Sequence, residues 1–135
     1  MIKAANLGKE IAAVASNKVG ILADMSKLLA ESNINIEAVA GYAQGNQAKI
    51  MLVCADNARA TDALKEAGYK SIQESEVIVV ELENKPGALK IITEKLVAEN
   101  IDIKQIYGTT CSTNCPAKLI FTTSDNSKAL AALKQ

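Results

Sequence analysis

The hydrophobic positions of the chain change their period in a fixed order, which predicts alternating strands and helices. Two apolar runs of strand length, rich in β-branched residues, occupy 10–15 and 77–83. Each run leads into an Asn-Lys-x-Gly turn, after which apolar residues recur at helical spacing. The predicted apolar helix faces consist of Ile21, Leu22, Met25, Leu28 and Leu29 after the first turn, and Leu89, Ile92 and Leu96 after the second.

The segment that follows the first helix predicts a hairpin, a second helix and a last strand. Residues 33–43 and 48–55 have the pattern of strands, with a turn around Gln44-Gly45-Asn46. We expect Asn57 to cap a short helix that Gly68 ends, and a fourth strand to follow over 69–74. Strand, helix, strand, strand, helix, strand is the order of a ferredoxin-like unit.

The chain contains this unit twice. Residues 17–36 align with residues 84–103 at an offset of 67 without a gap, and eight of the twenty positions are identical. Farther along the offset is 69, so the second copy has gained two residues between Gly108 and Ala117. The gain falls in the stretch CSTNCP, which we expect to form a hairpin tip.

The repeat predicts an α+β fold of two ferredoxin-like βαββαβ modules in tandem, residues 1–75 and 76–135. Each module should be an antiparallel sheet with both helices on one face. The second copy stops at residue 135, where its second helix should end, so its fourth strand is missing. We expect residues 2–7 to lie beside the second module and to supply that strand.

Composition and charge narrow the classes of partner. Fifteen basic and fifteen acidic residues cancel, and Tyr and Phe together number only four, which argues against nucleic acid and anionic membranes as partners. A hydrophobic content of 49% is ample for a packed core, whereas no apolar run approaches the roughly 18 residues of a membrane span. We therefore expect a soluble, cytoplasmic protein.

The chemistry-bearing residues argue against an enzyme. The chain has no histidine, which removes the commonest general base and metal ligand, and no phosphate loop or carboxylate dyad emerges. We expect no catalytic residues, no cofactor and no metal. Three cysteines fit a reducing compartment better than a disulfide framework. Cys111 and Cys115 do not have the spacing of a zinc knuckle or a thioredoxin-type pair, so two thiols that merely lie close compete with a redox role.

The repeated turn has the properties of an anion-binding loop. A tight turn before a helix leaves backbone N–H groups unpaired, with the positive end of the helix dipole behind them, so a ligand carboxylate is a natural guest. Asn17 or Asn84 would add a donor and an acceptor at the rim. The alternative is a plain helix start, with Pro86 at the first helical position. The N–H groups concerned belong to Gly20, Ile21 and Leu22 in the first copy and to Gly87, Ala88 and Leu89 in the second.

NKPGAL after a strand and AEN-IDI after the helix, echoed by SNKVGIL and ESNINI, resemble the ACT domain, a regulatory module that typically binds amino acids. The resemblance covers nearly the whole chain, in the manner of small stand-alone tandem ACT proteins. It implies that modules pair side by side and bind effectors at the shared interface, where the loop of one module faces the second strand of the other. By this correspondence Asn17 with Gly20–Leu22 would face Asp102, and Asn84 with Pro86–Leu89 would face Asn35 and Ile36.

The two implied sites are not equivalent. Asp102 replaces an amide by a carboxylate, which favours an ammonium group but repels a carboxylate. Val19 stands where the family usually has proline. We therefore expect the Asn84 site to be the better amino-acid site.

The resulting hypothesis is a regulatory sensor of an amino acid that has no catalytic domain. Exposed sheet edges also make a homodimer the expected assembly. A first alternative is an interaction protein that docks onto a metabolic enzyme without a ligand of its own. A second alternative is a thiol or metal carrier.

Overall fold

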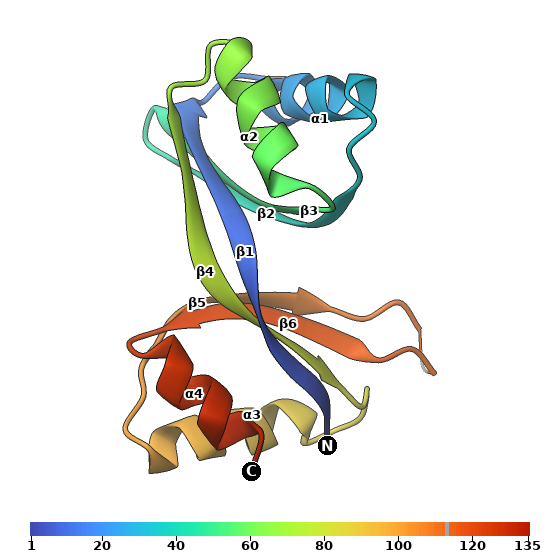
Figure 1. Cartoon of the computed structure of the whole chain (residues 1–135), viewed down its shortest axis with the longest axis vertical. Helices are drawn as coiled ribbons and strands as arrows, with labels where there is room; N and C mark the ends of the chain where they lie inside the picture. Colours follow the sequence, from blue (N-terminus) through green and yellow to red (C-terminus); the bar gives the residue numbers. More distant parts are fainter. Residues whose placement is uncertain (113) are drawn as a thin grey trace. The chain divides into compact units, whose positions relative to one another are not determined.

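The computed structural model describes residues 1–112 and 114–135, and these contain six strands and four helices (Figure 1). Thr113, which belongs to the expected hairpin tip, lies outside the described residues. Along the chain the elements are β1 (Ile2–Ser16), α1 (Ile21–Glu31), β2 (Ile36–Gln44), β3 (Gln47–Cys54), α2 (Asn57–Glu66), β4 (Ser71–Leu82), α3 (Ala88–Ala98), β5 (Ile103–Thr109), β6 (Ala117–Thr123) and α4 (Asn126–Leu133).

The chain forms two compact units. One consists of Lys9–Ser75, and the other combines Met1–Gly8 with Glu76–Gln135. The strand order is β2-β3-β1-β4 in the first unit and β1-β4-β6-β5 in the second. In each unit the two helices cover one face of the strands (Figure 1). The expected α+β class with ferredoxin-like modules is thereby confirmed, whereas a division into modules at residues 75 and 76 stays a prediction.

The strands β1 and β4 are longer than the sequence pattern indicates. Separate strands were expected over 2–7 and 10–15, and over 69–74 and 77–83, but each pair forms one continuous strand. No glycine, proline, asparagine or aspartate interrupts β4, so the strongest turn signals are absent from its sequence. Gly8 continues β1 and suits a close approach, because a Cβ atom there would lie 3.1 Å from Val79 Cγ2.

The amino-terminal residues contribute to the core of the Glu76–Gln135 unit. Ala5 is buried in that core and Ile2 packs against it. The backbone N–H of Glu83 donates a hydrogen bond to the carbonyl of Met1 (3.0 Å). Residues at the start of β1 therefore stand beside β4, the place where the repeat lacks a strand.

The two cores use equivalent positions of the repeat. Five pairs of residues related by the 67- or 69-residue offset are buried in both units, each residue with at most 3% of its surface exposed. Fully burying such a side chain stabilises a fold by about 1.5–3 kcal/mol. These pairs, one member in each core, are Ile11 and Ile78, Met25 and Ile92, Leu29 and Leu96, Leu52 and Phe121, and Leu64 and Leu133.

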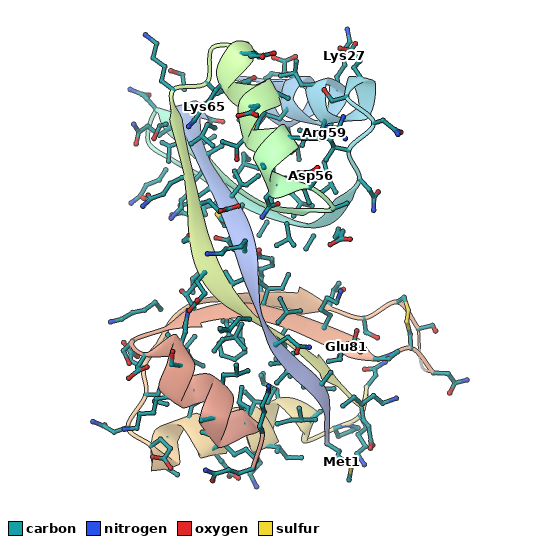
Figure 2. All side chains as sticks on the ribbon, viewed as in Figure 1. Met1, Lys27, Asp56, Arg59, Lys65 and Glu81 are labelled. Atoms are coloured by element: carbon teal, nitrogen blue, oxygen red, sulfur yellow. A yellow bond between two sulfur atoms is a disulfide. The ribbon has the colours of Figure 1, made fainter. Side chains whose placement is uncertain are left out.

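Helices α2 and α4 begin with side-chain caps. The carboxylate of Asp56 accepts from the Arg59 N–H (3.1 Å), and Asp56 lies at the start of α2 (Figure 2). The Asp125 carboxylate caps α4 through the Lys128 N–H (3.0 Å). The expectation that Asn57 caps α2 is wrong, because its amide instead accepts from the Cys54 N–H (3.0 Å) and donates to the Lys9 carbonyl (3.0 Å).

Candidate functional site

The loop before α3 has the geometry of an uncapped helix start. Gly87 is the N-cap residue, with φ 90°, and no side chain caps this end. The Ala88 N–H donates to the Lys85 carbonyl (3.2 Å), so one of the three N–H groups expected to be unpaired closes the turn instead. Pro86 precedes the cap and is not the first helical residue, because the left-handed Gly87 stands between it and the helix.

The loop before α1 repeats this geometry. Gly20 is the N-cap residue, with φ 94°, again without a side-chain cap. The Ile21 N–H donates to the Lys18 carbonyl (3.3 Å). A Cβ atom built on Gly20 or on Gly87 meets nothing within 4 Å, so the space before both backbones is open. Glycine serves here because its φ is one that side-chain-bearing residues rarely adopt.

Each unit contains one capped and one uncapped helix start. In each unit one helix has its first N–H groups capped by an aspartate, whereas the other begins at a left-handed glycine. Uncapped N–H groups at the positive end of a helix dipole attract a carboxylate or another anion. The two uncapped starts are those of the repeated Asn-Lys-x-Gly turn.

The two rim asparagines are held differently. The Asn84 side chain donates from Nδ2 to the Ser112 carbonyl (2.9 Å), in the connection between β5 and β6. In the other unit it is the backbone N–H of Asn17 that donates, to the carbonyl of Asn46 in the β2–β3 turn (2.8 Å). Sequence reasoning did not find Ser112, because it acts through its backbone and is 28 positions from Asn84.

A cavity of about 350 Å³ adjoins the loop before α3. Asn84, Ala88 and Leu89 line it from the loop and helix, and Thr109 and Leu119 line it from the strands. The equivalent loop in the other unit borders a cavity of about 520 Å³, to which it contributes Lys18 and Ile21. Both repeated turns therefore open onto hollows that mix apolar and polar side chains.

Charge at the Asn84 loop is partly balanced. Lys85 Nζ lies 2.7 Å from Glu83 Oε2. This hydrogen bond and the charge of Lys85 lower the pKa of the Glu83 carboxyl, and the amino terminus and Lys3 lower that pKa further. The negative charge of Glu83 is thus offset by nearby cations, of which Lys85 forms an ion pair with it. At the other loop Lys18 Nζ lies 3.3 Å from Asp24 Oδ2.

The residues expected to face the loops lie at or just before the starts of β2 and β5. Asn35 and Ile36 belong to the Lys9–Ser75 unit, and Asp102 belongs to the other. The Asn84 and Asn35 pair and the Asn17 and Asp102 pair each divide between the units, so both facing arrangements stay predictions. The Asp102 carboxylate lies 3.1 Å from Lys104 Nζ, a neutralising partner that the sequence argument did not include.

Not every repeated residue belongs to a site. Asn33 and Asn100 follow α1 and α3 with φ 56° and 55°. The next residue then returns a hydrogen bond to the helix, from Ile34 to Leu29 and from Ile101 to Leu96 (both 2.9 Å). A left-handed asparagine directly after the C-cap residue, here Ser32 or Glu99, is a common way to end a helix, so this part of the repeat preserves a folding signal.

The cysteines differ from expectation. Cys111 and Cys115 form a disulfide in the β5–β6 connection, visible as a yellow bond in Figure 2, whereas Cys54 is a buried free thiol. Their Cα atoms are 5.7 Å apart, within the normal range for a disulfide, because the hairpin turns back on itself. The expectation of two unbonded thiols is therefore wrong.

Among residues 1–112 and 114–135, no cluster of acidic or sulfur ligands suits a metal ion and no helix is long and apolar enough to cross a membrane.

The duplicated loops and cores agree with a match to a known family. The model of a family described as an ACT domain pair matches residues 8–133. The chain belongs to this family. This ACT domain pair is also similar to the crystal structure of protein BT0572 from Bacteroides thetaiotaomicron, with 26% identity and a TM-score of 0.88 over 96% of this chain and 88% of that one.

Other solved structures share the fold of this ACT domain pair at lower identity. The ligand-free regulatory subunit of aspartate kinase from Thermus thermophilus is 15% identical, with a TM-score of 0.69 over 100% of this chain and 98% of that chain. Aspartokinase III of E. coli, solved with aspartate and ADP, is 16% identical, with a TM-score of 0.60 over 99% of this chain and 34% of that chain. No curated protein sequence matches the chain significantly.

Proposed function

We propose that this ACT domain pair is a regulatory protein that binds an amino acid, or a similar small zwitterion, at the loop before α3. The proposal rests on the start of α3. This helix begins at the left-handed Gly87 and no side chain caps it, whereas Asp125 caps α4 in the same unit. The ligand carboxylate would take the place of a cap. Uncapped N–H groups and open space in front of Gly87 support this assignment.

The surroundings of the loop suit the rest of such a ligand. The adjoining cavity of about 350 Å³ is at the small end of ligand pockets, which run from about 300 to 1,000 Å³. Leu82 and Leu119 offer apolar surface there, and Thr109 offers a hydroxyl. The Asn84 amide retains its carbonyl oxygen as an acceptor for an ammonium group. The Asn17 loop remains the weaker candidate, because Val19 there is fully exposed and replaces the proline.

The comparisons support a regulatory role more than a catalytic one. The aspartate kinase structure from Thermus thermophilus is described as a regulatory subunit, and the one from E. coli contains aspartate. By analogy with those proteins, we propose that the chain acts on a metabolic enzyme and has no reaction of its own. The strands β2 and β5 end the two strand orders and offer edges for a homodimer.

A thermal-shift screen of the twenty amino acids, followed by calorimetry, tests the proposal. A ligand that binds only the folded chain stabilises it by about 2.7 kcal/mol at a hundredfold excess over its Kd. Asn84→Ala should weaken the binding that is found, whereas Asn17→Ala, the equivalent change in the other unit, should weaken it less. A flat response to all amino acids would refute the proposal. Equal effects of the two variants would refute the choice of site.

A second candidate is an interaction protein without a ligand. Val39 on β2 and Ile106 on β5 are equivalent in the repeat, and both side chains are exposed on strands at the ends of the strand orders. Exposed apolar positions on edge strands favour pairing with another chain. Light scattering of the intact chain, with and without the double substitution Val39→Lys and Ile106→Lys, tests whether these edges mediate self-association. A flat amino-acid screen together with loss of association in the variant would favour this candidate.

A further inference from the structure

The β5–β6 connection carries a disulfide at the position where the second repeat gained two residues. Cys111 is exposed and Cys115 is partly exposed, so the bond is accessible to solvent. The equivalent connection in the other unit is the turn between Gln44 and Gln47, which contains no cysteine. The disulfide therefore distinguishes the Asn84 loop from the Asn17 loop.

The carbonyl of Ser112, between the two cysteines, is a junction of hydrogen bonds. It accepts from Asn84 Nδ2 (2.9 Å), from the Cys115 N–H (3.1 Å) and from the Thr110 hydroxyl (3.3 Å). A carbonyl is only an acceptor, so the Asn84 amide must present its nitrogen here. The Thr110 hydroxyl also lies 3.2 Å from the Cys115 carbonyl. The disulfide joins Cys111, the neighbour of Ser112 in the chain, to Cys115, whose N–H and carbonyl both take part in these contacts.

A second cavity lies between the tip of the β5–β6 connection, which carries the cysteines, and the loop before α3. It has a volume of about 210 Å³ and is lined by Asn84 and Lys85 on one side and by Asn114 and Cys115 on the other. The two surfaces face each other within one unit. A change in the conformation of the tip is therefore a change in the wall opposite Asn84.

We propose that Cys111 and Cys115 form a reversible thiol–disulfide site, whose oxidised form fastens the Asn84 amide to the Ser112 carbonyl. The co-reactant is a dithiol of the kind that reduces exposed protein disulfides. Its thiolate attacks the exposed Cys111 sulfur, the S–S bond breaks, and Cys115 leaves as a thiolate that takes up a proton. The second thiol of the reductant then displaces Cys111, so that two electrons and two protons pass to the pair and the reductant becomes a disulfide. The reverse exchange reoxidises the pair.

The consequence for ligand binding rests on the proposed function. In the oxidised chain the Asn84 amide is immobilised, and it keeps its carbonyl oxygen and one N–H for a ligand. In the reduced chain the tip loses its covalent closure, and the amide must be ordered again when a ligand binds. Since one neutral hydrogen bond of this kind is at stake, reduction should raise the Kd by about two- to tenfold. The redox state of Cys111 and Cys115 would thereby change the ligand affinity of the Asn84 loop and leave that of the Asn17 loop unaffected.

Side-chain amide signals in NMR spectra of the ¹⁵N-labelled full chain test, without any ligand, whether the disulfide holds the Asn84 amide on the Ser112 carbonyl. The chain is equilibrated in reduced dithiothreitol and in oxidised glutathione, and maleimide labelling with mass spectrometry confirms each thiol state. Reduction should shift the Asn84 amide signals and speed their exchange with solvent, whereas those of Asn17 should stay in place as an internal control. A double variant, Cys111→Ser with Cys115→Ser, should match the reduced chain and ignore the redox buffer. Unmoved Asn84 signals in the reduced chain, or failure of the pair to reoxidise, would overturn the proposal whether or not the variant folds.

Calorimetry in both redox states tests the regulatory step. It uses the amino acid that stabilises the oxidised chain most in the thermal screen. A Kd two- to tenfold higher after reduction supports the step, and an equal or lower Kd overturns it. If no amino acid binds in either state, the proposed function fails and the regulatory step fails with it, while the amide signals still decide the thiol–disulfide tie.

Discussion

Replacing Gly87 by Ala, compared with a matched control, distinguishes the effect of this glycine on stability from its effect on ligand binding. Gly87 has φ 90°, a region that costs a residue with a Cβ atom about 1–2 kcal/mol. Alanine also restricts the unfolded chain, but at a position with positive φ this gain of about 0.4–1 kcal/mol is smaller than the cost in the folded chain. No clash adds to the cost, since the new Cβ meets nothing within 4 Å. The net expectation is a loss of about 1 kcal/mol in the free energy of unfolding.

The matched control is Gly68→Ala. Gly68 has φ 100° and equally open surroundings, but it follows α2 in the other unit. Both variants should lose a similar free energy of unfolding in urea titrations. Only Gly87→Ala should also weaken the amino acid found in the screen, by about tenfold or more, because a methyl group would stand where the ligand approaches charge-assisted N–H donors. Unchanged stability of Gly87→Ala would refute the backbone argument, and equal affinities of the two variants would refute the binding argument.

Three further predictions concern stability. Phe121→Ala should cost about 3–5 kcal/mol in denaturant titrations, because Phe121 is fully buried in its core; a cost below 1 kcal/mol would contradict that packing. Asp125→Ala should remove the cap of α4 and cost about 1 kcal/mol, while Asp62→Ala, in the interior of α2 where the cap is Asp56, serves as a control with little effect. The lowered pKa of Glu83 means that its contribution to stability is present above the carboxyl's ordinary value of 4.5 and is lost as pH falls through the lower folded value. Glu83→Gln should therefore flatten the pH dependence of unfolding in that acidic range, and an identical pH profile would contradict the pairing with Lys85.

The repeat made much of the fold predictable, because residues at equivalent positions proved to occupy equivalent places. Ile11 and Ile78, one in each core, follow from the offset, whereas the turn at Gly45 follows from local turn chemistry. The start of a helix was less predictable where two neighbouring residues can both act as its cap. Asp56 and Asn57 can each cap a helix, and the choice depended on the strand backbone at Lys9, 48 positions away from Asn57.

The candidate site was predictable in part. The uncapped starts at Gly20 and Gly87 follow from the composition of the turn, since glycine has no side chain with which to cap the helix that follows. The Asn84 contact with Ser112 does not follow, because it joins a side chain to a backbone carbonyl whose position depends on the path of the hairpin. The repeated Asn33 and Asn100 show that repetition alone does not separate a binding residue from a folding signal.

By itself the sequence determined the duplicated order of elements, the apolar faces and the two glycine turns. These depend on periodicity and local turn chemistry, which neighbouring residues encode. The tertiary structure alone decided that residues 2–7 and 10–15 form one continuous strand, and that Cys111 and Cys115 meet across a hairpin tip tied to Asn84. Such contacts depend on which strands pair and on how each hairpin closes, and these follow from the free energy of the whole packed unit, not from any one segment.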